Sequence, residues 1–468
     1  MTDTQKIQVG DLIDNSRWSG YQKWLLALTA VAFAVDGMAN QVLAVAIPSL
    51  MEVWQIGRDS FSPVLFWGLF GVTAGSLVGG LLGDKIGRRW ALIASMLIFG
   101  AATVATGFAA NIDMLKWLRL LDGFGIGAAI PNGAALISEY TPERRRSRGI
   151  AWGMVFIPVG SSLVALLGSL LLKEGGHGWD IYFMVAGAVP LLAALSFVFV
   201  LPESPRYLQS QPQRRQELLH LLRRFGHALP DGTRFVEQPI GRLHLQLTAL
   251  FAKAVRRDTL AIWGAFFFAL IAGYSLFSWI PTMLRGAGFS FAQAGSGISS
   301  LHFGGIAGGV AVGWIIEQLG SRRSLLGLAL GSIAMALALS AVLAATDTSF
   351  GTVAVLLAFE GFFIAGINTV VYTLAAHAYS PVVKATGVGA AATVGRLGAM
   401  ASSYSGEWTL SWGGAPLYFI GVAVLVGLCL VFGLLVSRHI GRYNSQQQVT
   451  AANPRETTQA QQAALEHS

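Results

Sequence analysis

The seven residues Gly83-Asp84-Lys85-Ile86-Gly87-Arg88-Arg89 end one apolar stretch, and a second apolar stretch follows directly. A related segment, Glu317-Gln318-Leu319-Gly320-Ser321-Arg322-Arg323, occurs 233 positions later in the same setting. Each segment has an acid, a glycine three residues on, and a trailing basic pair, which suits a tight charged turn between two helices. The recurrence predicts that the chain is a tandem duplication.

The composition predicts a protein that lies within a membrane. Of the 468 residues, 54% are hydrophobic and 12% are charged, whereas a soluble globular protein carries about 25% charged residues. The single cysteine, Cys429, excludes an intramolecular disulfide and a cysteine-built metal site. We expect no metal, no cofactor and no enzymatic activity, and the chain has no phosphate-binding Gly-x-x-x-x-Gly-Lys-Ser/Thr loop.

Twelve apolar stretches are long enough to cross about 30 Å of hydrocarbon. They cover residues 22–47, 61–83, 90–110, 114–138, 149–172, 179–201, 258–284, 292–316, 323–345, 352–378, 385–407 and 413–437. The predicted fold is therefore an all-α membrane protein with twelve transmembrane helices in two six-helix halves.

The predicted domains follow from these spans. Residues 1–201 form the first half, 202–257 a cytoplasmic linker, 258–442 the second half, and 443–468 a tail expected to be disordered. Within the linker, leucines among arginines at 214–225 predict a basic amphipathic helix, which either lies on the membrane surface or caps the bundle.

The basic residues predict the orientation of the chain. With both termini in the cytoplasm, 26 Lys and Arg residues fall on the cytoplasmic side and four on the other, as the positive-inside rule requires. The net charge of +8 thus sets topology and does not indicate nucleic-acid binding. We expect a multi-pass protein of the bacterial inner (cytoplasmic) membrane, with the lipid bilayer around it, that works as a monomer.

Ionisable side chains inside the predicted spans are candidates for function, because a charge near the bilayer centre costs several kcal/mol unless it is paired or hydrated. Asp36, Arg119, Asp122 and Glu360 are predicted to couple transport to protons. A carboxylate that pairs with Arg119 in one state and takes a proton in another would supply that coupling. The alternative is a set of fixed ion pairs that only join helices.

Arg396, in the eleventh span, is predicted to bind an anionic substrate group through its two-pronged guanidinium. The alternative is a structural pair with Glu407 or another acid. Further predicted substrate-binding residues supply aromatic, amide or imidazole groups, with packing or lipid-facing positions as the alternative: Trp279, Tyr372, Asn368, Asn132 and His302.

Short echoes support the duplication and suggest a family. Asp122-Gly123-Phe124 recurs as Glu360-Gly361-Phe362, and Tyr140-Thr141-Pro142 as Tyr379-Ser380-Pro381. Together with the loop motif, this pattern resembles the major facilitator superfamily of secondary transporters, in which the substrate site lies between two repeats near mid-membrane.

Several stretches resemble one branch, the aromatic acid:proton symporters. They are Arg119–Asn132, Ser278-Trp279-Ile280-Pro281-Thr282, Gly395-Arg396 and Asp36-Gly37, although Met38 and Ala39 stand where the branch motif has an aromatic residue and a second acid. The resemblance implies import of a small aromatic carboxylate with protons by alternating access. Asp122 and Glu360 are acids where the branch has small or neutral residues.

The loop motif and its echo are predicted to act as a gate. Its basic residues can bind carbonyls at helix ends and its acid can bind a helix N-terminus, so that contacts break when the halves rock. The alternative is plain positive-inside anchoring. The predicted gating residues are Gly83, Asp84, Gly87, Arg88, Arg89, Glu317, Arg322 and Arg323.

Three other functions remain open at this point. Sugar or polyol uptake is favoured by Pro202-Glu203-Ser204-Pro205-Arg206, a stretch shared with sugar porters, but span 7 lacks the paired glutamines of those proteins. Export by antiport would require a glycine-rich proline motif where span 5 has only Pro158-Val159-Gly160. A non-transporting sensor would not need the ion-handling groups.

Overall fold

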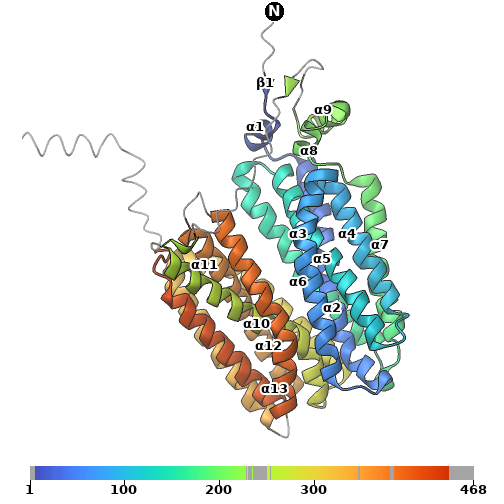
Figure 1. Ribbon diagram of the computed structural model, residues 1–468, viewed down its shortest axis with the longest axis vertical. Coiled ribbons are helices and arrows are strands. Elements are labelled where there is room, and N and C mark those ends of the chain that lie inside the picture. The colour runs from blue at the N-terminus through green and yellow to red at the C-terminus, as the bar shows by residue number, and fades with distance from the viewer. Residues whose placement is uncertain are drawn as a thin grey trace, which may run out of the picture.

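The computed structural model describes residues 6–227, 229, 234–235, 250–252, 255–345, 348–379 and 384–441, and these form two helical halves that lie side by side (Figure 1). The first half contains α2 (Gly20–Trp54), α3 (Phe61–Ile86), α4 (Arg88–Thr106), α5 (Ile112–Tyr140), α6 (Glu143–Leu171) and α7 (Trp179–Val200). The second contains α10 (Arg256–Gly286), α11 (Phe291–Ala344), α12 (Phe350–Ala378) and α13 (Lys384–Leu435). The tail predicted at 443–468 lies outside the described residues.

Ten helices in the described part of the chain are long and apolar enough to span a membrane. Two of these labels each cover two successive helices: α11, of 54 residues, has a non-helical break at Gly320, and α13, of 52 residues, has one at Gly413 and Gly414. Divided at these glycines, the ten helices account for all twelve predicted spans.

The duplicated loop motif places its glycine at the same kind of turn twice. Gly87 ends α3 with φ +100°, and Gly320 breaks α11 with φ +75°. Residues with a Cβ rarely adopt this left-handed backbone, so glycine is what allows the chain to reverse here between two spans.

Close helix packing in the first half depends on missing side chains. A Cβ on Gly37 of α2 would lie 1.9 Å from the Ile157 carbonyl oxygen of α6, and one on Gly160 of α6 would lie 1.7 Å from the Ala34 carbonyl oxygen. The two helices thus touch backbone to backbone, as small residues permit within membranes.

The linker side of the first half carries the short elements, and we call this end of the molecule the linker face. There lie β1 (Lys6–Ile7), which pairs in parallel with β2 (Arg234–Phe235), α1 (Val9–Asp14), α8 (Pro205–Gln209), the 3-10 helix η3 (Pro212–Arg214) and α9 (Arg215–Arg224) (Figure 1). The leucines of α9 are buried, and the Phe225 ring lies 6.1 Å from the Tyr21 ring and 6.3 Å from the Tyr140 ring. The predicted amphipathic helix therefore caps the bundle.

The other end of the molecule, the opposite face, carries two short 3-10 helices, η1 (Arg58–Ser60) between α2 and α3 and η2 (Glu174–Gly176) between α6 and α7. The helices run between these two faces, so residues near the middle of each span meet at the centre of the molecule.

Candidate transport site

A cavity of about 370 Å³ lies between the two halves, at the middle of the helices. This volume is within the range of small-molecule sites. Most of its wall is apolar, from residues such as Leu65, Val72 and Ile126. The polar groups come from both halves: Asp36, Asn40, Gln41, Arg119 and Ser161 from the first, and Tyr274, Ser278, His302, Asn368 and Arg396 from the second.

Two predicted coupling residues form an ion pair at the cavity wall. Arg119 and Asp122 lie one turn apart on α5 and bind each other through Nη1 and Oδ2. The second carboxylate oxygen of Asp122 accepts a hydrogen bond of 3.0 Å from the Thr103 hydroxyl of α4. Asp122 is fully buried and Arg119 is 8% exposed, so each charge is balanced by the other in a site with little water.

Asp36 lies at the same wall without a cation. Its Oδ2 accepts a 3.3 Å hydrogen bond from Asn40, one turn further along α2, while its Oδ1 is buried with no hydrogen-bond partner. Among the described residues, Asp36 makes no ion pair.

Arg396 faces this cavity from the second half. Within the described part of the chain it has neither an ion-pair nor a hydrogen-bond partner. The structural pair with Glu407 is excluded, because eleven residues along α13 correspond to about 16 Å and Glu407 accepts a 2.6 Å hydrogen bond from Ser411 instead. Arg396 is thus a cation at the cavity wall that no acid among the described residues contacts, although Asp36 lines the same cavity.

Two residues predicted to act in coupling or substrate binding lie away from the cavity. Glu360 is fully buried between helices, where its Oε1 accepts a 2.8 Å hydrogen bond from Ser332. Asn132 donates to the carbonyls of Gly79 and Ala128, at 2.9 and 2.8 Å. Asn132 therefore joins α5 to the end of α3, close to the loop motif, and its position does not fit the predicted contact with substrate.

Two predicted aromatic residues are not among those that line the cavity. Trp279 is fully buried, and its indole N–H donates a 3.3 Å hydrogen bond to the Ser402 carbonyl within the second half. Tyr372 packs edge-on against Phe266 at a ring distance of 4.6 Å, one turn beyond Asn368 toward the linker face. Asn368 and His302, in contrast, line the cavity, so their predicted contact with substrate stays open.

Sequence reasoning missed the residues that close the cavity on the side of the opposite face. Gln41 of α2 donates a 2.9 Å hydrogen bond to the Phe277 carbonyl of α10, and its side-chain oxygen lies 3.2 Å from Nε2 of His302 on α11. One signal was visible in the sequence. Pro281 stands four residues after Phe277 and has no backbone N–H, so the Phe277 carbonyl lacks the hydrogen-bond donor that a regular helix would supply.

The first copy of the loop motif is a bonded structure within the first half. Arg88 pairs with Asp84 and donates a 3.3 Å hydrogen bond to the Gly80 carbonyl. The Arg89 guanidinium donates to the Val198 carbonyl near the end of α7, as predicted for a helix C-terminus, and its backbone N–H donates to Glu203 at 3.0 Å. Burial raises the pKa of the Glu203 carboxyl above its usual value.

The second copy of the motif is bonded differently. Ser321, which stands where the first copy has an arginine, donates its backbone N–H to the Ile440 carbonyl at 3.0 Å and accepts from the Ile440 N–H at 2.9 Å. The predicted gating side chains of this copy, Glu317, Arg322 and Arg323, are exposed. The duplication is therefore conserved in backbone geometry more than in side-chain contacts.

An ion-pair cluster joins the halves at the opposite face. Arg285, at the end of α10, binds Glu174 of η2 with two contacts of 3.0 and 2.8 Å and Glu52 of α2 at 2.7 Å. Its guanidinium also lies 3.9 Å from the centre of the Phe291 ring. We call Arg285, Glu52 and Glu174 the clasp. Together with the Gln41 bonds, it closes the cavity toward the opposite face.

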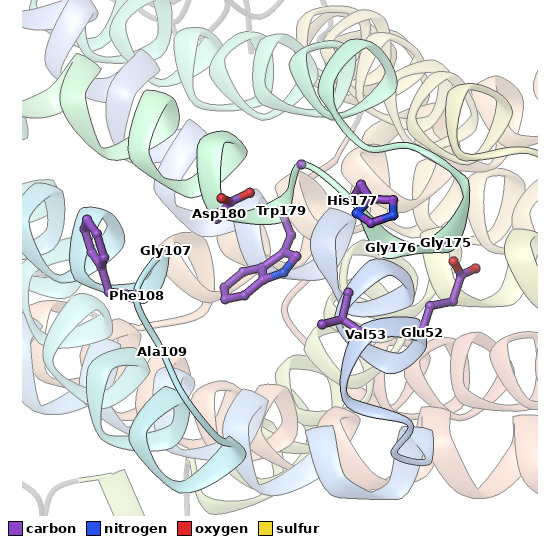
Figure 2. Close-up of a pocket in the computed structure, with 11 residues that line it drawn as sticks. Glu52, Val53, Gly107, Phe108, Ala109, Gly175, Gly176, His177, Trp179 and Asp180 are labelled. Atoms are coloured by element: carbon purple, nitrogen blue, oxygen red, sulfur yellow. The ribbon is translucent and has the colours of Figure 1, made fainter.

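A second hollow of about 640 Å³ lies at the opposite face and is open to the surface. Figure 2 shows the Trp179 indole between Phe108 on one side and Val53 and Glu52 on the other. The hollow is built from helix ends and loops of the first half alone. Because this hollow lies at one face only, it cannot open alternately to the two sides of a membrane. The central cavity lies between the two halves and is the better candidate for the transport site.

Comparisons with known proteins agree with this geometry. The family model described as Major Facilitator Superfamily matches residues 29–346. The gallate transporter of Pseudomonas putida is 33% identical over 88% of this chain and 91% of its own length. The 4-hydroxybenzoate transporter PcaK of Pseudomonas aeruginosa is 30% identical over 87% of this chain and 91% of its own length.

Two further matches extend the comparison. The 3-(3-hydroxy-phenyl)propionate transporter of Escherichia coli is 30% identical over 80% of this chain and 84% of its own length. Among solved structures, the partially occluded inward open conformation of the xylose transporter XylE from E. coli matches with a TM-score of 0.67 at 16% identity, over 90% of this chain and 99% of that one. At this identity, the match to the xylose transporter concerns the fold alone.

Proposed function

We propose that this chain, which belongs to the major facilitator superfamily, imports small aromatic carboxylates together with protons. The family and the names of the relatives make it a transporter and not an enzyme. The observation that carries the proposal is Arg396, a cation with no ion-pair partner among the described residues, which faces a largely apolar cavity between the two halves.

The proposed substrate has one charged end and a flat apolar body. Arg396 can bind a carboxylate through two parallel hydrogen bonds, and Asn368 and Ser278 lie on the same wall as further hydrogen-bonding groups. The apolar side chains would cover the ring. Three relatives are named for substrates of this type: gallate, 4-hydroxybenzoate and 3-(3-hydroxyphenyl)propionate.

We assign proton coupling to Asp36. Arg119 and Asp122 cancel each other, so the remaining charges around the empty cavity are Asp36 and Arg396. A bound carboxylate neutralises Arg396 and leaves Asp36 uncompensated in an apolar setting, which favours uptake of a proton. Asp36 would release that proton when substrate leaves. Glu360 lies away from the cavity, so we do not assign it a part in this exchange.

Alternating access is the proposed transport cycle. The positive-inside bias supports a cytoplasmic location for the linker face, and with that orientation the clasp and the Gln41 bonds would close the external side in this conformation. Opening outward would break them and bring the loop motif of the first half against the second half. The stretch from Pro202 to Arg206 has a structural role here, since Glu203 binds the Arg89 backbone, and it gives no support to a sugar substrate.

Uptake of labelled 4-hydroxybenzoate into proteoliposomes tests the proposal. An inwardly directed proton gradient should drive accumulation, Arg396→Gln should abolish it, and Asp36→Asn should lose accumulation while keeping exchange across the membrane. Arg58→Gln, which removes a cation from the opposite face, is the control and should transport normally. Accumulation that is independent of the gradient, or that survives Arg396→Gln, would overturn the corresponding part of the proposal.

A further inference from the structure

Pro281 breaks the hydrogen-bond pattern of α10 at a defined place. In an α-helix the carbonyl of residue 277 accepts from the N–H of residue 281, but proline has no N–H to donate. The Phe277 carbonyl is therefore released inside a buried part of the second half. An unpaired carbonyl in such a place destabilises the fold, so the position of its replacement partner is informative.

That partner comes from the other half of the molecule. The Gln41 amide N–H of α2 donates to the Phe277 carbonyl at 2.9 Å, and the Gln41 oxygen lies 3.2 Å from Nε2 of His302. Gln41 is 3% exposed and His302 is 5% exposed, so little water competes for these bonds. One amide thus fixes both the backbone of α10 and the imidazole of α11.

The same contacts fix an aromatic ring at the cavity wall. The Phe277 ring stacks on the His302 imidazole, with ring centres 5.1 Å apart and planes 16° from parallel. The imidazole covers one face of the phenyl ring, while Phe277 is only half-buried and lines the cavity together with Gln41 and His302. The pair forms a flat, held surface on the same cavity as Arg396.

We propose that Phe277 is the residue that selects an aromatic ring in the substrate, and that Gln41 is a positioning residue that holds it through the carbonyl released by Pro281. This rests on the proposed function, because it assumes an aromatic carboxylate bound at Arg396. A planar ring can stack on Phe277 with an offset geometry, which is worth about 0.5–1.5 kcal/mol beyond burial. A saturated ring of similar size gains the burial but loses the stacking.

Equilibrium binding of benzoate and of cyclohexanecarboxylate to the purified full-length protein tests this inference. Both ligands are carboxylates that would use Arg396, and differences intrinsic to the two ligands cancel when parent and variant are compared, so the change in their affinity ratio reports the contact with the ring. Phe277→Leu should reduce the preference for benzoate about threefold to tenfold, toward equal binding, while Phe277→Tyr should keep it. Leu270→Ala removes apolar cavity wall without a ring and should weaken both ligands alike.

The role of Gln41 is tested by a double-mutant cycle with Pro281. Gln41→Leu should lower the benzoate preference several-fold, because the released carbonyl and the imidazole lose their partner. Pro281→Ala restores an N–H at residue 281, so in that background the same Gln41→Leu change should alter the preference clearly less than in the parent protein, and what remains comes from the lost contact with His302. Equal effects in both backgrounds would overturn the positioning role, and an unchanged preference in Phe277→Leu would overturn the ring selection.

The outcome for the unmodified protein separates this inference from the proposed function. If it binds neither carboxylate, the proposed function fails before the preference can be measured. If it binds both equally well, the transport of carboxylates stands and the role of Phe277 is refuted.

Discussion

Removal of the Arg285 side chain should open the molecule at the opposite face. The clasp joins α10 of the second half to Glu52 and Glu174 of the first, so Arg285→Ala removes every ion pair of this cluster at once. The Arg285 side chain is 19% exposed, Glu52 34% and Glu174 68%, so solvent screens these pairs substantially.

The expected size of the effect follows from this exposure. Solvent-exposed pairs contribute about 0.2–1 kcal/mol each, and the two-contact pair with Glu174 belongs at the upper end of that range. Two such pairs give about 1–2 kcal/mol, which corresponds to a factor of about 5–30 in the ratio of outward-closed to outward-open molecules. Salt should reduce the effect, because it screens charges at the surface.

Spin-label distances measure this ratio directly. Cys429 is buried and can be replaced by Ala, after which labels at Ala110 and Ala292, both exposed at the opposite face, report the separation of the halves. Arg285→Ala should move population to longer distances, whereas Arg58→Ala, a charge loss on the same face at a residue outside the clasp, should not. Identical distance distributions for Arg285→Ala and the parent protein would refute the clasp as a closing contact.

Three other substitutions test the packing and the charges. Gly160→Ala places a Cβ 1.7 Å from a carbonyl oxygen and should cost about 3 kcal/mol or more, seen as a lower melting temperature, whereas Gly80→Ala meets nothing within 4 Å and should be neutral. Asp122→Asn leaves Arg119 buried without its counterion and should cost about 3–5 kcal/mol, so a melting temperature within a degree of the parent's would contradict the ion pair. Burial raises the pKa of the Glu203 carboxyl, so the folded state binds the carboxyl proton more tightly than the unfolded state does. The protein should therefore lose stability as the pH rises from the ordinary carboxyl pKa through the raised one. Glu203→Gln should remove this loss, and a dependence of melting temperature on pH that is the same in this variant and the parent would refute the assignment.

The fold could be predicted because its signals are long and repeated. Twelve apolar stretches of membrane length and a duplicated glycine turn specify the helices with little ambiguity. The structure adds the exact positions of the turns within α11 and α13, which lie at Gly320 and at Gly413–Gly414, where the backbone is not helical. Propensity alone does not decide between a turn and a kink in such places.

The cavity could be predicted only in part, because helices that are apolar all round do not reveal which face points inward. Tyr274, Phe277 and Ser278 share one face of α10 and line the cavity, whereas Trp279 lies about 100° further round and packs inside the second half. Charged residues were easier to place, because a charged side chain within a membrane span, such as Asp36 or Arg396, almost always faces the interior of the bundle or a cavity. The Gln41 bond needed tertiary structure, since it joins residues 236 positions apart.

The most direct test of proton-coupled import follows both solutes in the same vesicles. Proteoliposomes with no imposed pH gradient receive external 4-hydroxybenzoate while uptake of the label and the internal pH are recorded together. The proposed coupling through Asp36 predicts that the interior acidifies in step with uptake, and that Asp36→Asn removes the acidification while the substrate still exchanges. Uptake by the unmodified protein with no change of internal pH would contradict it.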